Sequence, residues 1–147
     1  MEGRMKVSLR EPVSVVSALG VACILALGSL VGATGQKDKA PSPKAITVDL
    51  TATEYVRLLG GPPETVSMHS GLVVLKPGKS VGTHNTENYE EVLVVLEGTG
   101  QMTITDGPEL SLDANMMAYC PPRTEHNVTN TGNGPLRYIY IVANAEW

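Results

Sequence analysis

The sequence contains few of the residues on which several kinds of small protein depend. Two cysteines in 147 residues exclude a scaffold held by many disulfides and a cysteine-rich zinc module. Lys and Arg number 11 against 15 Asp and Glu, without a basic run, which argues against nucleic acid as a partner. The chain has only three histidines. A metal site would therefore have to use His69, His84 or His126 together with carboxylates.

The N-terminal segment has the pattern of a secretory signal peptide. Arg4, Lys6 and Arg10 precede an uncharged apolar run over 13–33, which ends in small residues. This pattern predicts a signal peptide over 1–33 and a periplasmic or secreted protein. The run is also long enough to cross a bilayer, so the alternative is an N-terminal membrane anchor, which would give the protein a membrane partner. Residues 34–45 are polar and contain two prolines, which predicts a flexible linker.

Residues 46–147 have the pattern of one all-β domain. Thr51 and Glu54 fit a capping box, which predicts a short N-terminal helix over Tyr55–Leu59, ended by the glycines that follow. Ile46–Leu50 alternates and is β-branched, as strands are. Beyond Thr65, short apolar runs alternate with Gly, Pro, Asn and Asp turns, which predicts a β-sandwich or barrel. The expected strands are Ser70–Leu75, Glu91–Leu96, Gln101–Thr105, Leu110–Leu112, Met116–Cys120, Asn127–Asn130 and Leu136–Val142.

Several of these strands are apolar on both faces. Residues 72–75 and 92–96 are uninterrupted apolar runs. A strand without alternation is covered on both sides. The barrel interior covers one face, and a second sheet or a second copy of the chain would cover the other. We therefore expect a homodimer.

Three potential metal ligands lie at the ends of expected strands. His84 follows the Pro77-Gly78 turn, Glu91 begins a strand, and His126 begins a later one. A barrel can bring such strand ends together. Two imidazoles and one carboxylate form a facial triad with open positions, which suits Fe(II) and also Mn, Zn, Co or Ni. The spacing of these three residues does not by itself distinguish a metal site from ordinary histidines at loop edges.

A longer pattern around these residues resembles the cupin superfamily. The first motif of that family runs G-x5-H-x-H-x(3,4)-E-x6-G. Here Gly78 is followed by His84, Glu91 and Gly98 at the matching spacings. Thr86 stands where the family has its second histidine.

The second cupin motif runs G-x5-P-x-G-x2-H-x3-N. This chain has Asn115, Pro121, Arg123, His126 and Asn130 at the five fixed positions. Asn replaces the first glycine and tolerates the left-handed backbone region better than most residues. Arg123 replaces the second glycine, so an ordinary backbone conformation is expected there.

The resemblance implies a cupin-type double-stranded β-helix, also called a jelly-roll barrel, of the small single-domain cupin type-2 kind. It also implies that His84, Glu91 and His126 bind a divalent metal ion. The Thr86 hydroxyl is a poorer ligand than imidazole but can hydrogen-bond a bound water or a substrate oxygen. His69 is a candidate substitute ligand, and Tyr138 is a candidate pocket residue. Glu90 should face solvent, since only one of two adjacent strand residues points inward.

Two functional hypotheses follow from the resemblance. The first is a metal-dependent enzyme of dioxygenase, isomerase or lyase type that acts on a small organic molecule. The alternative is a non-catalytic module that binds a sugar or an organic acid, or a degenerate cupin without metal. Neither a catalytic base nor a substrate is indicated by the residue pattern, and fold alone does not decide between these functions.

Overall fold

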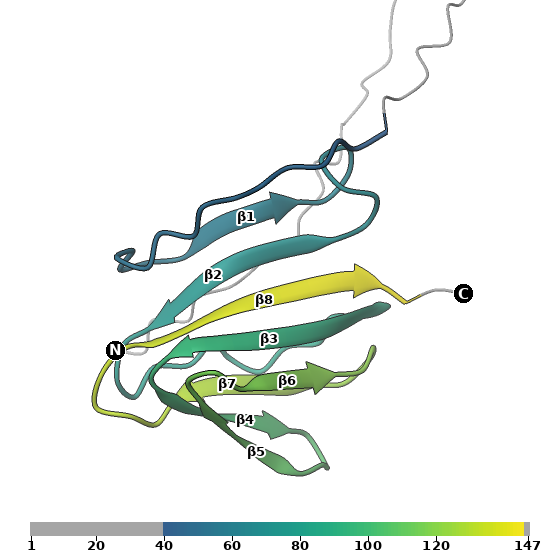
Figure 1. The fold of residues 1–147 in the computed structure, drawn as a ribbon. Coiled ribbons are helices and arrows are strands. Elements are labelled where there is room, and N and C mark those ends of the chain that lie inside the picture. The colour runs from purple at the N-terminus through teal and green to yellow at the C-terminus, as the bar shows by residue number, and fades with distance from the viewer. Residues whose placement is uncertain (1–39, 146–147) are drawn as a thin grey trace, which may run out of the picture.

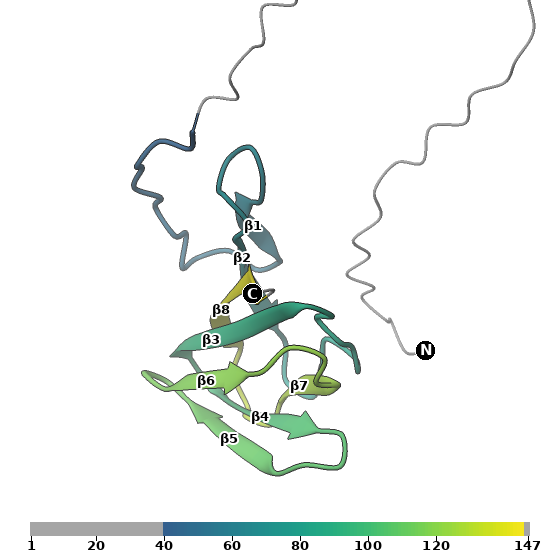
Figure 2. The same cartoon turned by 90° about the vertical axis from the view of Figure 1, so that its right-hand side faces the viewer.

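The computed structural model describes residues 40–145 and contains eight β-strands in that range. A five-stranded sheet has the order β1-β2-β8-β3-β6, and a three-stranded sheet has the order β5-β4-β7 (Figures 1 and 2). All strand pairs are antiparallel. The strands are β1 (Val56–Gly60), β2 (His69–Leu75), β3 (Tyr89–Glu97), β4 (Thr99–Ile104), β5 (Glu109–Asp113), β6 (Met117–Cys120), β7 (His126–Asn130) and β8 (Leu136–Asn144).

The two sheets pack face to face as a jelly roll, and the expected all-β fold is confirmed. β8, the last strand, lies between β2 and β3, so it joins distant parts of the chain in one sheet. Figures 1 and 2 place β1 and β2 on the side of the molecule away from β4 and β5. β1 therefore lies beyond the edge of the smaller sheet.

The core lies between the sheets and is built from alternate strand residues. On β3, Leu93 and Val95 are buried inward, and on β8 the inward residues are Leu136 and Tyr138. Met102 of β4 contributes from the smaller sheet. Burial of each large apolar side chain stabilises the fold by about 1.5–3 kcal/mol before the entropy cost of ordering. This alternation fixes which residues of β3 face the interior, and Glu91 is among them.

The expected helix over Tyr55–Leu59 is wrong, because the structure has the strand β1 there. Five residues form too few internal hydrogen bonds to be a stable helix on their own. As an edge strand, the same residues pair with β2 from Val56 opposite Leu72 to Gly60 opposite His69. The capping-box threonine instead joins a turn, where its backbone N–H and its hydroxyl both donate to the Asp49 carboxylate.

The seven strands expected beyond Thr65 are present as β2 to β8 and begin or end within a few residues of the predicted limits. Ile46–Leu50 is not a strand in the structure. Residues 40–45 contain no helix or strand and are exposed, and the linker remains a prediction. The predicted signal peptide or anchor over 1–33 lies outside the described residues. Within the described part of the chain, no helix is long and apolar enough to span a membrane.

The motif turns adopt left-handed backbone angles. Gly78 and Gly98 have φ of 71° and 85°, and Asn115 at 69° behaves as expected for a glycine replacement. The expectation for Arg123 is wrong, because its φ is 60° and it keeps the left-handed conformation. Hydrogen bonds support this strained residue: its N–H donates to the Glu87 carbonyl at 2.7 Å, and its guanidinium donates twice to Asn88 Oδ1.

Candidate metal centre

The three expected ligands come from three separate parts of the barrel. Glu91 points inward from β3 and is 6% exposed, and His126 begins β7 and is 1% exposed. His84 lies in the segment after β2 and forms an isolated bridge with His126. The N–H of each histidine donates to the carbonyl of the other at 2.9 Å. This reciprocal pairing fixes the two imidazoles side by side, with ring centroids 4.4 Å apart.

One ligand atom from each of His84, Glu91 and His126 lies within 4.8 Å of the others. His126 Nε2 is 3.1 Å from Glu91 Oε2. The structure therefore brings together the three residues that the motifs single out. Two nitrogen donors and one carboxylate around a common point are a donor set that suits a divalent transition metal.

Hydrogen bonds to main-chain carbonyls orient both imidazoles in the same way. His84 Nδ1 is 2.9 Å from the Gly82 carbonyl oxygen, and His126 Nδ1 is 2.9 Å from the Thr124 carbonyl oxygen. A carbonyl only accepts, so each Nδ1 must carry the proton and donate. The neutral form of each ring then has its lone pair on Nε2. Such outer hydrogen bonds fix the tautomer and ring orientation of metal-binding histidines.

The surroundings of His126 favour its protonated form in the metal-free protein. Burial by itself lowers the pKa of His126, but the hydrogen bonds to Glu91 and to the Thr124 carbonyl outweigh it and raise the pKa above its usual value. A bound cation would take the place of this proton between His126 and Glu91. The pair is therefore complementary to a positive charge.

Cys120 lies against the outer side of the His126 ring. It is the residue of β6 opposite Glu91, it is fully buried, and its Sγ is 3.3 Å from His126 Nδ1. Burial, together with the Glu91 charge, raises the pKa of the Cys120 thiol to about 11. The thiol therefore stays protonated at neutral pH and packs as a small side chain.

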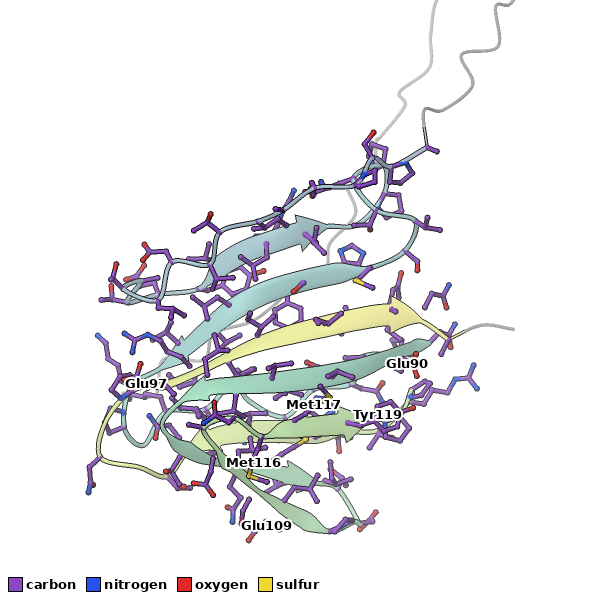
Figure 3. The ribbon with its side chains drawn as sticks, in the orientation of Figure 1. Glu90, Glu97, Glu109, Met116, Met117 and Tyr119 are labelled. Carbon is purple, nitrogen blue, oxygen red and sulfur yellow. The ribbon has the colours of Figure 1, made fainter. Side chains whose placement is uncertain are left out.

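Thr86 and Glu90 both have partners outside the ligand group. The Thr86 hydroxyl donates to the Tyr89 carbonyl at 2.8 Å, within its own loop. Glu90 accepts a 3.2 Å hydrogen bond from the hydroxyl of Tyr119 on β6, and Figure 3 shows both residues labelled on this side of the sheet. Glu91, not Glu90, is the inward carboxylate, as the strand period together with the motif spacing predicts.

His69 is not part of the three-residue ligand group. In the β-sheet register it pairs with Val142 of β8, and Val142 pairs with Glu91, so one aliphatic residue separates the two. The His69 ring instead contacts the Tyr89 ring edge-on, with centroids 6.0 Å apart. The ring also lies close to Gly61, where an added Cβ would lie 2.2 Å from His69 Cε1. A direct role as fourth ligand therefore has no support from this arrangement.

Two tyrosines of β8 point inward beside Glu91. Tyr138 is 2% exposed, and burial, followed by the Glu91 charge, raises its pKa well above the usual value. Tyr140 is partly buried, and its hydroxyl is 3.0 Å from that of Tyr55. The sequence pattern did not indicate Tyr55 as a site residue. Recognition of β1 as a strand would have placed Tyr55 on the inner face, because inward residues alternate.

Comparisons with known proteins place the site in a family context. The profile of the cupin domain family matches residues 71–142. An uncharacterised protein of Methanocaldococcus jannaschii is 32% identical over 66 residues, which cover 45% of this chain and 52% of that protein. A protein of Thermotoga maritima named oxalate-binding protein is 29% identical over 68 residues, covering 46% and 55%. The chain thus spans about half the length of these two relatives.

A solved structure shows the same fold at low sequence identity. It is an RmlC-like cupin family protein of Methanocaldococcus jannaschii, described as a double-stranded β-helix. The TM-score is 0.59 at 18% identity, and the match covers 70% of this chain and 92% of that one. At this identity the similarity supports the jelly-roll fold and does not extend to the activity.

Proposed function

Because residues 71–142 are a cupin domain, we propose that the protein holds a divalent metal ion through His84, Glu91 and His126 and binds a small organic molecule there. The observation that carries this proposal is the convergence of the three ligand atoms within 4.8 Å in the barrel interior. Fe, Mn, Zn, Co and Ni all suit two imidazoles and one carboxylate. When bound, such an ion would act as a Lewis acid on a substrate oxygen.

The protein's own residues would supply orientation and hydrogen-bond donors. The Gly82 and Thr124 carbonyls hold His84 and His126 with Nε2 available. Tyr138 and Tyr140 keep their hydroxyl protons at neutral pH, since burial and the Glu91 charge raise the pKa of both. The site therefore offers donors that would bind an oxygen atom of a ligand.

This set of protonated groups favours a binding role as the second candidate function. Cys120, Tyr138 and Tyr140 lie near Glu91, and a raised pKa makes each of them a poor general base. The relative named oxalate-binding protein supports an organic acid as ligand. A non-catalytic module that binds a small organic acid is thus a supported alternative to a metal-dependent dioxygenase, isomerase or lyase.

Metal analysis of the purified chain tests the proposed centre. The parent protein and the variants His84→Ala, Glu91→Ala and His126→Ala would be loaded with each candidate metal, desalted and analysed by mass spectrometry. We expect about one ion per chain in the parent and a loss of at least tenfold in affinity in each variant. His69→Ala is the matched control and should keep the metal. The proposal would be contradicted if the parent holds no metal after loading and if EDTA leaves its melting temperature unchanged.

We propose export by the N-terminal segment, as the basic start and apolar run indicate. The protein would then be periplasmic or secreted, or attached to the membrane if the segment is retained. N-terminal sequencing of the mature protein tests this. A first residue near position 34 would support cleavage, a full chain in the membrane fraction would support the anchor, and a full chain in the cytosol would refute export.

We also propose that a second copy of the chain covers the outer face of β3 and β6. Val92 pairs with Tyr119 and Val94 with Met117, and all four side chains point away from the core. Tyr119 is 53% exposed and Met117 is 69% exposed, and Figure 3 shows both on this side of the sheet. Exposed apolar surface of this kind marks association sites.

Light scattering after size-exclusion chromatography tests the homodimer. The parent should have the mass of two chains, and Met117→Glu should shift it toward one. Val66→Glu is the matched control, because Val66 is apolar and 82% exposed outside this face. A monomeric parent would refute the homodimer and leave the metal proposal unaffected.

A further inference from the structure

A row of residues crosses the larger sheet beside the proposed metal ligands. In the β-sheet register, Arg57 of β1 pairs with Gly71 of β2. Gly71 also pairs with Tyr140 of β8, and Tyr140 pairs with Leu93 of β3. Residues that pair directly in a sheet lie on the same face. Leu93 is two residues from Glu91 and faces inward with it. The row therefore lies on the inner face, two residues along the strands from the row that contains Glu91.

Two tyrosines on this face form a hydroxyl pair. The ring of Tyr55, just before β1, stacks on the ring of Tyr140 with centroids 6.4 Å apart and planes 15° apart. Their hydroxyl oxygens are 3.0 Å apart, so one donates to the other. The hydroxyl that accepts keeps its own proton available for a further partner. The pair thus presents a donor that is held in place by ring stacking.

Gly71 is what allows this pair to form. A Cβ at position 71 would lie 2.6 Å from Tyr55 Cε2 and 2.8 Å from Tyr140 Cε1. Both contacts are far shorter than van der Waals separation. Any side chain at this position would therefore push the rings apart. The glycine and the two tyrosines are consequently one structural unit.

The pair is close enough to Glu91 to share a ligand with the proposed metal centre. Tyr140 is a diagonal cross-strand neighbour of Glu91, a separation of roughly 7–8 Å between Cα atoms. Burial, then the hydrogen bond to Tyr55, then the Glu91 charge raise the pKa of Tyr140, while the Arg57 charge lowers it. Tyr140 is therefore within electrostatic reach of both the carboxylate and the guanidinium.

Arg57 brings positive charge to the same face. Its guanidinium packs over Gly60, and its Nη2 is 3.8 Å from Glu64 Oε2. Glu64 already accepts stronger hydrogen bonds, from Lys44 Nζ at 2.8 Å and from the Gly60 N–H at 2.7 Å. The Arg57 side chain is 68% exposed. Its planar group of five donors is suited to bind a carboxylate in two-point fashion.

We propose that Tyr55, Tyr140 and Arg57 bind a carboxylate of an organic acid whose other end lies at His84, Glu91 and His126. This inference rests on the proposed function and specifies its ligand class. A carboxylate is negatively charged and only accepts hydrogen bonds, so it complements a cation and the available hydroxyl donor of the tyrosine pair. A neutral polyol would not use the charge. β1, the strand that carries Arg57, would thus serve ligand recognition as well as the sheet.

Calorimetric titration with malonate, succinate and pyruvate tests the ligand class, with malonamide and succinamide as neutral counterparts. The full chain would be used in metal-loaded and EDTA-treated forms. We expect at least one acid to bind at least tenfold more tightly than its neutral counterpart. Arg57→Gln and the double variant Tyr55→Phe with Tyr140→Phe should each weaken that binding about tenfold, and Arg57→Lys should weaken it less. Metal content should stay at the parent level in all of these variants.

Matched controls separate this inference from the proposed metal centre. Lys76→Gln removes an exposed positive charge elsewhere on the surface, and Tyr119→Phe removes a phenol on the outer face, so neither should change acid binding. Acid binding that depends on the metal but not on Arg57 or the tyrosines would overturn the inference and leave the metal centre standing. Absent or equally strong binding of acids and neutral counterparts would also overturn it. A parent protein that binds neither a metal ion nor an organic acid would refute both proposals.

Discussion

Substitution of Asn130 should destabilise the fold without removing a metal ligand. Asn130 ends β7, is 1% exposed, and uses its whole amide group. Its Nδ2 donates to the carbonyls of Leu75 and Gly134, both at 2.8 Å, and its Oδ1 accepts from the Gly132 N–H at 2.9 Å. The side chain thus ties β7 to the end of β2 and to the turn before β8.

The magnitude follows from these hydrogen bonds. At about 1 kcal/mol of net stability for each bond, Asn130→Ala should lower the free energy of unfolding by about 3 kcal/mol, since three bonds are lost. With a urea slope of about 1.5 kcal/mol per molar, the unfolding midpoint should fall by about 2 M. Asn130→Asp should cost at least as much, because its carboxylate would face two carbonyl oxygens.

Urea unfolding followed by circular dichroism measures this effect, and a neighbouring asparagine provides the control. Asn127 donates one long bond, 3.4 Å to Thr129 Oγ1, and its Oδ1 is buried without a partner among the described residues. Asn127→Ala should therefore change the free energy of unfolding by less than about 1 kcal/mol. The reasoning is refuted if Asn130→Ala unfolds within 0.5 M of the parent midpoint, a margin of roughly a quarter of the expected shift.

Three further predictions concern a turn, the buried thiol and pH. Gly98→Ala should destabilise the fold by about 3 kcal/mol or more, because φ is 85° and the new Cβ would lie 2.3 Å from the Pro135 carbonyl oxygen. Thermal unfolding measures this loss. The control Gly134→Ala should show no such loss, because no atom lies within 4 Å of a Cβ added there. Cys120, with its pKa raised from 9.0 to about 11, should carry about a hundredfold less thiolate than an ordinary thiol. Maleimide should therefore label the EDTA-treated native protein slowly at pH 7, and rapid labelling would contradict the buried position of Cys120. Because the pKa of His126 is raised, the ion pair between His126 and Glu91 stabilises the metal-free fold below the usual histidine pKa of 6.5. This stabilisation is lost as the pH rises through the raised pKa of His126. A metal ion that binds to His126 must displace the same proton. Metal affinity measured by calorimetry should therefore rise from pH 6 to pH 8, and a flat profile would count against the site.

Local patterns in the sequence were sufficient for most of the strands, and the family resemblance supplied the candidate ligand group. Alternating or continuous apolar runs between turn residues identified β2 to β8, because burial and turn chemistry act over a few residues. The period of two along β3 allowed only one of Glu90 and Glu91 to point inward, and the six residues from Glu91 to Gly98, as in the cupin motif, selected Glu91. The resemblance to the two cupin motifs implied His84, Glu91 and His126 as ligands, and the structure brings one ligand atom of each within 4.8 Å of the others.

The errors lie where partners distant in sequence decide the conformation. Residues Tyr55–Leu59 have weak local preferences, and pairing with β2 makes them a strand instead of a helix. Arg123 keeps a left-handed conformation because Glu87 and Asn88, far along the chain, hold its backbone and guanidinium.

By itself, the sequence determined the β-rich pattern, because burial and turn chemistry depend on residue type and short-range spacing. The inward carboxylate and the three candidate ligands followed from its resemblance to the two cupin motifs. The tertiary structure decided that His84 and His126 pair through their backbones and that Cys120 lies behind the His126 ring. It also decided that the edge strand β1 brings Arg57 and Tyr55 to the face that carries Glu91. These arrangements depend on which strands become neighbours, and burial of a shared core selects those neighbours from segments far apart in the chain.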